Sequence, residues 1–221
     1  MRERLIEATL RTLALAAVGI LALVALFVGR EGAPVLAAEG LGAFLLTAEW
    51  APTRGAYGLL AMLAGSALVT ALALALALPL GLACAITLAE LAPPPARRVL
   101  KPLVELLAGI PSVVYGFLGL SLVVPLVREA PWLGGTGQSA LAAGIVLAVM
   151  VLPTLASVSV DALEAVPASY REGARALGAD RWQAIRGVVL PAARSGIVAA
   201  VILGVGRAVG ETMAVIMVAG N

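Results

Sequence analysis

Two charged residues, Arg207 and Glu211, stand four positions apart in a segment that is otherwise apolar. We expect one helix to carry both, so that their side chains lie on the same face. A charge at the centre of a bilayer costs about 2.5–3.5 kcal/mol or more, and such residues usually have a function. A guanidinium suits a tetrahedral oxyanion, and a carboxylate accepts a hydrogen bond from a protonated one. Phosphate near neutral pH keeps a P–OH group and sulfate does not, so the pair predicts a path for a protonated oxyanion.

The alternative is a self-neutralising pair that only packs a helix bundle. Arginine before glutamate is the less favourable order for such a pair, which weakens this alternative. Gly206 and Gly210 each stand one position before a charged residue, and small residues at this spacing let another helix or a solute approach closely. We therefore favour a transport role for Arg207 and Glu211.

The elements that must hold these residues are membrane-spanning helices. Of the 221 residues, 62% are hydrophobic and 13% are charged, which is far from the balance of a soluble domain. Repeated apolar runs approach the roughly 20 residues that a spanning helix needs. We expect an all-α polytopic membrane protein with five spans, at residues 12–28, 59–88, 103–127, 140–160 and 197–219.

Prolines fall inside three of these spans. The second is too long for a perpendicular helix, so we expect it to be tilted, kinked at Pro79 or extended past the membrane. Pro111 frees a backbone carbonyl in the third span, and Pro153 is expected to break the fourth. Such breaks are tolerated at membrane depth where protein or water satisfies the freed groups. Helices broken in this way fit a path that opens alternately to the two sides.

The distribution of basic residues predicts the orientation. With the N-terminus in the cytoplasm, the external segments hold only Arg30, Arg54 and Arg128, and most other basic residues fall inside. This asymmetry follows the positive-inside rule. We divide the chain into residues 1–56, with the N-terminal cytoplasmic segment, the first span and an external loop, and a core of residues 57–221.

The longest polar segment, residues 161–194, is rich in arginine and predicted to be cytoplasmic. Pro167 suits the first turn of a helix, and Gly178 suits the position after a helix C-terminus. Asp180 can then cap a second helix, with Gln183 completing a capping box. We reject a DNA-binding helix-turn-helix, because spans tether both ends of the segment. The other alternative is a solvated loop that merely obeys the positive-inside rule.

The order of residues in this segment resembles the EAA signature of binding-protein-dependent ABC importer permeases. Gly173 replaces the middle alanine of the signature and Val188 replaces an isoleucine. In that family the segment docks on an ATPase subunit, so we name residues 161–194 the coupling module. The residues that the resemblance assigns to ATPase coupling are Glu172, Gly173, Ala174, Gly178, Leu190 and Pro191.

Residues 206–215 resemble the fifth-helix motif of phosphate importer permeases of the PstC type, and residues 78–90 and 101–117 resemble the same subunit. Molybdate and sulfate permeases continue the motif with Phe-Gly, and the sister PstA type usually with Ala-Pro. The pair Thr212-Met213 therefore favours phosphate. The resemblance covers roughly residues 60–221. It implies a MetI-like helical bundle whose sixth helix is absent here, with a substrate path lined by Arg207, Glu211 and Thr212.

The resemblance also implies partners in a bacterial plasma (inner) membrane. These are a second permease subunit (PstA-like), an ATPase dimer (PstB-like) and an extracytoplasmic phosphate-binding protein that touches the loops near residues 39–54 and 129–137. Lipid surrounds the spans, and no nucleic acid is expected. The sequence contains no P-loop, so we expect ATP hydrolysis by a partner and no enzyme activity in this chain.

With no histidine and one cysteine, the sequence predicts neither a metal site nor a cofactor. Three alternatives to a phosphate importer stay open. They are a molybdate or sulfate permease, a membrane scaffold or sensor of phosphate status, and a channel that needs no ATPase.

Overall fold

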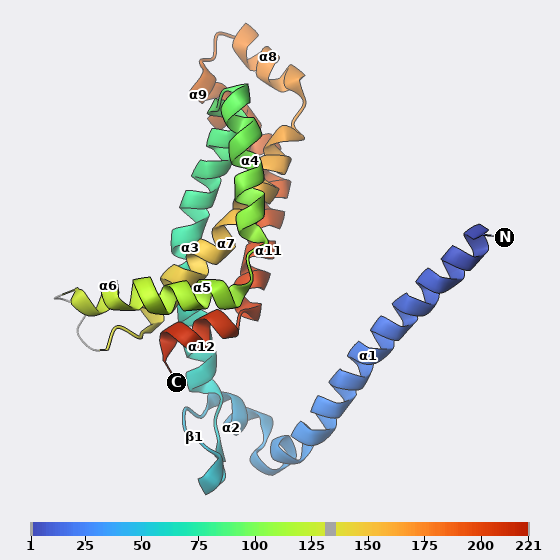
Figure 1. The fold of residues 1–221 in the computed structure, drawn as a ribbon, viewed down its shortest axis with the longest axis vertical. Helices are drawn as coiled ribbons and strands as arrows, with labels where there is room; N and C mark the ends of the chain where they lie inside the picture. Colours follow the sequence, from blue (N-terminus) through green and yellow to red (C-terminus); the bar gives the residue numbers. More distant parts are fainter. Residues whose placement is uncertain (1, 131–135, 221) are drawn as a thin grey trace. The chain divides into compact units, whose positions relative to one another are not determined.

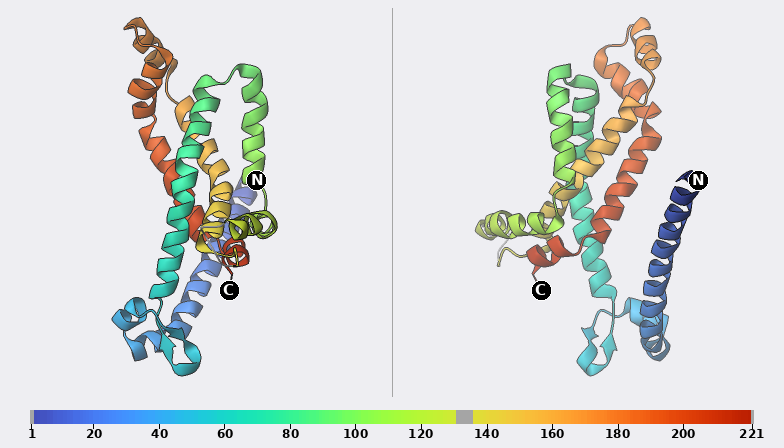
Figure 2. Two further views of the ribbon diagram at one scale, coloured as in Figure 1. Left: turned by 90° about the vertical axis from the view of Figure 1, so that its left-hand side faces the viewer. Right: turned by 45° about the vertical axis from the view of Figure 1, so that its right-hand side comes forward.

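The computed structural model describes residues 2–130 and 136–220, and they are almost entirely helical (Figures 1 and 2). The chain divides into two compact units, Met1–Ala64 and Gly65–Asn221, and each is described by itself. The division falls inside helix α3 (Leu60–Ile86). Part of the predicted external loop at residues 129–137, namely residues 131–135, lies outside the described residues.

Unit 1 begins with one long apolar helix, α1 (Arg2–Glu39), which extends the first predicted span at both ends. A short helix, α2 (Leu41–Leu46), follows, and then a hairpin of β1 (Trp50–Ala51) and β2 (Ala56–Tyr57) around a 3-10 turn, η1 (Pro52–Arg54). The rings of Trp50 and Tyr57 pack edge to face across the hairpin, with centroids 6.0 Å apart. This pair closes the open end of the hairpin.

Unit 2 is organised around α7 (Ala140–Glu164), its most extensively buried helix. Leu155 of α7 faces glycines on two neighbours, α3 and α11 (Arg194–Gly210). A Cβ placed on Gly81 would lie 2.4 Å from Leu155 Cδ2, and one on Gly204 would lie 3.6 Å from Leu155 Cδ1. Small residues therefore let α3 and α11 approach α7 closely. In the right-hand view of Figure 2, the middle of α7 lies between them.

Pro153 does not break α7, so the predicted break in the fourth span is wrong. The helix runs without interruption from Ala140 to Glu164, and Pro153 is buried within it. Proline removes one backbone hydrogen bond, and α7 is held on several sides by other helices, so packing keeps it whole. α3 likewise continues through Pro79 and ends in a π-helical turn, η2 (Thr87–Leu91).

The third predicted span is two helices that run in different directions. α4 (Pro94–Ala108) ends before Pro111, and α5 (Ser112–Leu118) begins after it. A π-helical turn, η3 (Gly119–Val123), and α6 (Val124–Glu129) continue α5, and Figure 1 shows them running across the direction of α4. The expectation of one span over residues 103–127 is wrong, because the chain leaves the helical conformation before Pro111, and proline disfavours that conformation in the residue before it.

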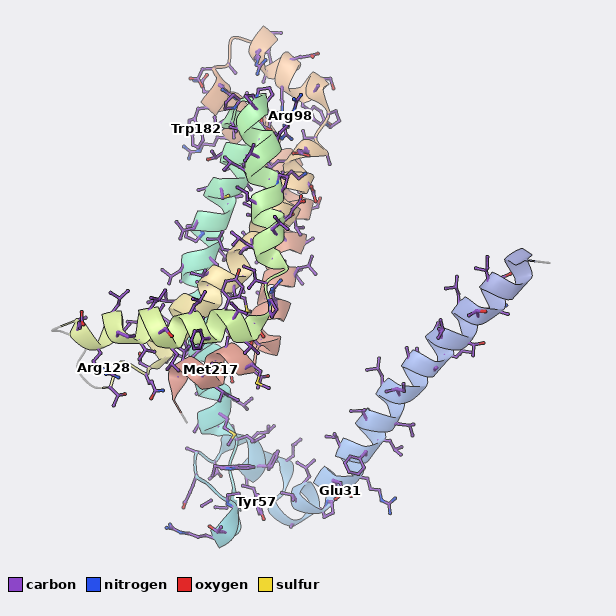
Figure 3. The ribbon with its side chains drawn as sticks, viewed as in Figure 1. Glu31, Tyr57, Arg98, Arg128, Trp182 and Met217 are labelled. Carbon is purple, nitrogen blue, oxygen red and sulfur yellow. The ribbon has the colours of Figure 1, made fainter. Side chains whose placement is uncertain are left out.

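The fifth predicted span is also broken. α11 ends at Gly210, Glu211 adopts an extended conformation (φ −79°, ψ 122°), and α12 (Met213–Ala219) begins two residues later. α12 packs against α5, where a Cβ on Gly116 would lie 2.9 Å from Met217 Sδ (Figure 3). The predicted helix over residues 197–219 is therefore wrong. Burying α12 against α5 stabilises the turn away from α11.

The described residues contain four helices long and apolar enough to cross a membrane. They are Ile6–Ala38, Leu60–Leu91, Ser112–Glu129 and Ala140–Glu164. A fifth is counted if Arg181–Ala192 and Arg194–Gly210, which meet at 69°, form one bent span. The predicted class, an all-α polytopic membrane protein, is confirmed.

Candidate functional site

Arg207 joins the two helix breaks of unit 2. It lies in the last turn of α11 and is half-buried. Its Nη1 donates to Thr154 Oγ1 of α7 at 2.8 Å, and its Nη2 donates to the carbonyl oxygen of Ala108 at 3.1 Å. Ala108 is the last residue of α4, so the guanidinium satisfies a carbonyl that no helical N–H can reach.

Tyr115 satisfies the neighbouring carbonyl of the same helix end. The ring is buried in α5, and its hydroxyl donates to the carbonyl oxygen of Leu107 at 2.8 Å. Side chains from α5 and α11 thus bind two consecutive carbonyls where α4 stops. Such internal hydrogen bonds are what an interrupted helix needs at membrane depth.

Glu211 does not face Arg207 along one helix, so the predicted same-face pair is wrong. The helix ends before Glu211, whose Oε1 accepts a hydrogen bond from the backbone N–H of Ala214 at 2.9 Å. The carboxylate therefore stabilises the first turn of α12. Thr212 lies at the break itself, exposed, and its side chain makes no capping hydrogen bond.

Arg207 therefore has only neutral hydrogen-bond partners among the described residues. Among the described residues no carboxylate lies within salt-bridge distance of Arg207, and its two hydrogen-bond acceptors are a hydroxyl and a carbonyl. A half-buried guanidinium has five N–H donors and keeps its charge. The arrangement can therefore attract an anion and donate to it.

The coupling module has the predicted helix–glycine–helix form. α8 (Ala168–Ala176) is followed by Leu177 as its C-cap and then by Gly178, whose φ of +87° lies in the left-handed region that favours glycine. The N–H groups of Gly178 and Ala179 donate back to the carbonyls of Arg175 and Ala174, at 2.9 and 3.1 Å, closing a Schellman motif. Pro167 precedes α8 as its N-cap instead of lying in its first turn.

The second helix of the module is capped as predicted. In α9 (Arg181–Ala184) the Asp180 carboxylate accepts from the backbone N–H of Gln183 at 2.8 Å, and the Gln183 side chain accepts from the N–H of Asp180 at 2.9 Å. A π-helical turn, η4 (Ile185–Val189), and α10 (Leu190–Ala192) lead on to α11.

The residues assigned to ATPase coupling lie on two sides of the module. Glu172 and Gly173 of α8 face outward, while Ala174 is buried. Leu190 is half-buried in α10 and Pro191 is exposed. Three large apolar or aromatic side chains are also exposed on the module: Leu177 (91% exposed), Tyr170 and Trp182, of which Figure 3 labels Trp182. Exposed apolar groups around a rigid turn are typical of a protein-docking surface.

Ion pairs hold the N-terminal half of α4 to the C-terminal end of α7. Lys101 Nζ lies 2.9 Å from Asp161 Oδ1 and 3.3 Å from Glu164 Oε2, and Arg97 pairs with Glu164 as well. The hydrogen bond to Asp161 is the main cause that raises the pKa of Lys101. The ammonium is therefore charged throughout the neutral range.

Two contacts in the structure were not predicted from the sequence. Arg171 pairs with the carboxylate of Glu90, and Arg207 donates to the hydroxyl of Thr154. Glu90 is an acidic residue at the end of the second apolar run, on the side of the membrane predicted for the arginines of residues 171–194, which was a usable signal. Thr154 follows Pro153 in a predicted span. A hydroxyl at this position is usually explained by a bond to a backbone group that the proline frees, so the sequence gives no reason to pair Thr154 with Arg207.

Residues 77–221 match the family of binding-protein-dependent transport system inner membrane components, and the chain belongs to this family. It is 46% identical over 202 residues to the probable ABC transporter permease protein YqgH of Bacillus subtilis, covering 90% of this chain and 65% of that protein. It is 38% identical over 198 residues to the phosphate transport system permease protein PstC of Haemophilus influenzae, covering 81% of this chain and 63% of that protein. It is 36% identical over 239 residues to the phosphate transport system permease protein PstC of Mesorhizobium japonicum, covering 100% of this chain and 73% of that protein.

These comparisons confirm the predicted family, which was based on the coupling module and residues 206–215. The chain spans less than two thirds of the length of the first two relatives.

Proposed function

We propose that this chain is a permease subunit of an ABC importer for inorganic phosphate. It would form part of the translocation path and couple that path to a separate ATPase. The observation that carries the proposal is Arg207, a half-buried guanidinium at the junction of two helix breaks, whose hydrogen-bond partners among the described residues are both neutral. The phosphate permeases among its relatives support the choice of substrate.

The residues around Arg207 can bind a partly protonated phosphate. The hydroxyl of Thr154 accepts from Arg207 and keeps its own proton to donate to an anionic oxygen. Glu211, which follows the break in α11, has one carboxylate oxygen on Ala214 and a second that can accept from P–OH. Thr212 would contribute at the same break. A substrate without a hydroxyl, such as sulfate, would face an unpaired carboxylate there.

The coupling module would transmit ATP hydrolysis to this path. In residues 172–178, every residue except Ala174 is exposed, and we assign the ATPase contact to this exposed surface of α8 and its turn. Leu177 supplies exposed apolar surface, and Glu172 supplies an exposed charge. Glu172→Lys should therefore uncouple ATP hydrolysis from uptake, and unchanged coupling in this variant would count against docking there.

The complete transporter would contain a second permease subunit, an ATPase dimer and an extracytoplasmic binding protein. We assign it to the bacterial plasma membrane, with the N-terminus of this chain in the cytoplasm, on the positive-inside distribution of its arginines. The external hairpin of unit 1 is a candidate contact for the binding protein.

The experiment that tests this function is ATP-dependent uptake of labelled phosphate by proteoliposomes that hold the complete complex. Unlabelled phosphate, sulfate and molybdate are added in turn as competitors. The proposal predicts that only phosphate competes strongly and that uptake stops without ATP. Strong competition by molybdate or sulfate would overturn the substrate, and uptake without ATP would overturn the coupling.

A further inference from the structure

The coupling module is attached to the rest of unit 2 at one nearly buried carboxylate. Glu90 lies in the π-helical turn at the end of α3, and its side chain is 9% exposed. Arg171 of α8 places Nε 3.1 and 3.2 Å from the two carboxylate oxygens, and Nη2 2.5 Å from Oε1. This bidentate arrangement is the strongest and most directional form of ion pair that these side chains make.

The same arginine also binds the end of α7. Its Nη1 donates to the carbonyl of Val166 at 2.6 Å, and its Nη2 donates to the carbonyl of Leu163 at 2.8 Å. Arg181, the first residue of α9, donates to the backbone carbonyl of Glu90. Glu90 therefore connects both helices of the module to the end of α3, through its carboxylate to α8 and through its backbone carbonyl to α9, and Arg171 also connects α8 to the end of α7.

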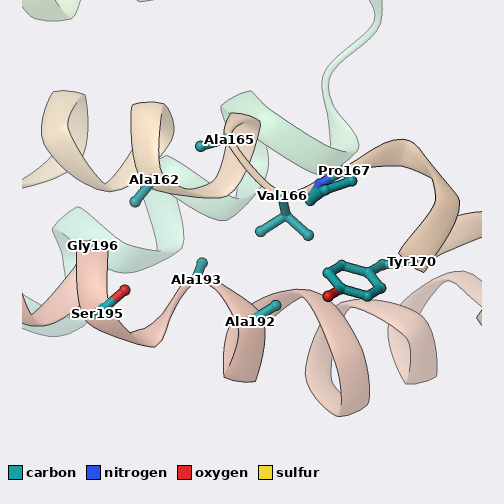
Figure 4. Close-up of a pocket in the computed structure, with 9 residues that line it drawn as sticks. All are labelled: Ala162, Ala165, Val166, Pro167, Tyr170, Ala192, Ala193, Ser195 and Gly196. Atoms are coloured by element: carbon teal, nitrogen blue, oxygen red, sulfur yellow. The ribbon is translucent and has the colours of Figure 1, made fainter.

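Apolar packing contributes little to holding α8 in place. Ala174 is the one buried residue among the nine described residues of this helix. A cavity of about 210 Å³ lies between the end of α7 and the junction of α10 with α11. Tyr170 of α8 borders it (Figure 4). Because this space leaves α8 loosely packed, its position depends on the polar contacts of Arg171.

We propose that Glu90 is a positioning residue that transmits movement of the coupling module to the ends of α3 and α7. The proposal rests on the proposed function, since an ATPase docked on α8 would impose the movement. A desolvated pair with this many hydrogen bonds moves as one body. The π-helical turn that carries Glu90 interrupts the regular hydrogen-bond ladder of α3, so the end of that helix can follow.

The test is hydrogen–deuterium exchange of the complete complex, with and without a nonhydrolysable ATP analogue. In the wild type, the analogue should change exchange both in the part of the module that holds α8 and α9 (residues 168–185) and at the end of α3 (residues 82–91). In Glu90→Gln, which keeps the shape but removes the charge, the module should respond and residues 82–91 should not. Phosphate transported per ATP hydrolysed should fall about fivefold or more, with the ATPase still bound.

The matched control is Glu164→Gln, which removes another carboxylate, one whose ion pairs join α4 to the end of α7 and do not involve α8 or α9. It should respond like the wild type. If Glu90→Gln does not assemble, Arg171→Lys takes its place, because it keeps a charge but cannot bind Glu90, Leu163 and Val166 together.

A response of residues 82–91 in Glu90→Gln equal to that of Glu164→Gln would overturn the proposal. So would unchanged phosphate transport per ATP. Absence of phosphate uptake by the wild-type complex would contradict the proposed function alone, because the exchange measurement needs no substrate and still decides the role of Glu90.

Discussion

The Nη2 atom of Arg207 lies 3.1 Å from the carbonyl oxygen of Ala108, although 99 residues separate the two in the chain. Ala108 ends α4 before one break, and Arg207 lies one turn before the other. Each break leaves polar backbone groups that need partners. One side chain thus stabilises a broken helix and, by the proposal above, attracts the substrate.

Replacing Thr154 by valine should weaken substrate binding while leaving the complex assembled. Valine keeps the volume but removes the acceptor of Arg207 Nη1 and the proposed donor to phosphate. A hydrogen bond to a charged group contributes about 1.5–3 kcal/mol, so the KM for phosphate should rise about tenfold or more. The control is Thr87→Val, whose hydroxyl binds only the carbonyl of Ala83 in its own helix. Equal KM values for the two variants would contradict the role of Thr154.

Substituting Glu211 by glutamine separates its two roles. The amide oxygen of glutamine can still accept from the N–H of Ala214, so thermal stability of the complex should change little. The substrate preference should change, because the negative charge that disfavours sulfate is gone. We expect the ratio of phosphate to sulfate uptake to fall about tenfold, a difference of about 1.4 kcal/mol. An unaltered ratio would mean that Glu211 serves only α12.

Gly178→Ala should impair docking of the ATPase. The φ of +87° is strained for any residue with a Cβ, at a cost of roughly 1–2 kcal/mol. Alanine would therefore disturb the turn that ends α8, and less ATPase should copurify with the permease. Gly187→Ala is the matched control, because the φ of Gly187 is not positive and the space around its Cβ position is open. Loss of ATPase from both variants alike would argue against a special requirement at Gly178.

Gly116→Ala should destabilise unit 2. The new methyl would lie 2.9 Å from Met217 Sδ and 3.0 Å from Ala214 Cα, and the second of these is backbone that cannot rotate away. Overpacking of this kind costs about 1–3 kcal/mol, so α12 should separate from α5 and the thermal midpoint should fall. Gly65→Ala, in open space on α3, should leave the midpoint unchanged or raise it slightly. Similar midpoints for both variants would contradict the close packing of α5 and α12.

The features that could be predicted from sequence are those decided by nearby residues. The turn at Gly178 and the capping box of Asp180 and Gln183 each depend on residues within one or two helical turns, and both are as expected. The long apolar runs likewise predict the spans α1, α3 and α7, because length and hydrophobicity are local properties.

The features that could not be predicted depend on packing between distant segments. Pro111 ends a helix and Pro153 does not, and the difference is the burial of α7 among its neighbours. The break at Glu211 has no proline to mark it, since it depends on α12 packing against α5. The pairs Glu90–Arg171 and Arg207–Thr154 join residues 81 and 53 positions apart, and no spacing rule connects them.

The central claim is that Arg207 binds the transported anion. Its most direct test is ATP-dependent uptake of labelled phosphate by proteoliposomes that hold the complete complex, with the wild type compared with Arg207→Ala and Arg207→Lys. Arg11→Ala is the control, because Arg11 makes an exposed pair with Glu7 that contributes little. We predict that uptake is abolished in Arg207→Ala and strongly reduced in Arg207→Lys, with the ATPase still bound in both. Wild-type uptake by an assembled Arg207→Ala complex would contradict the claim.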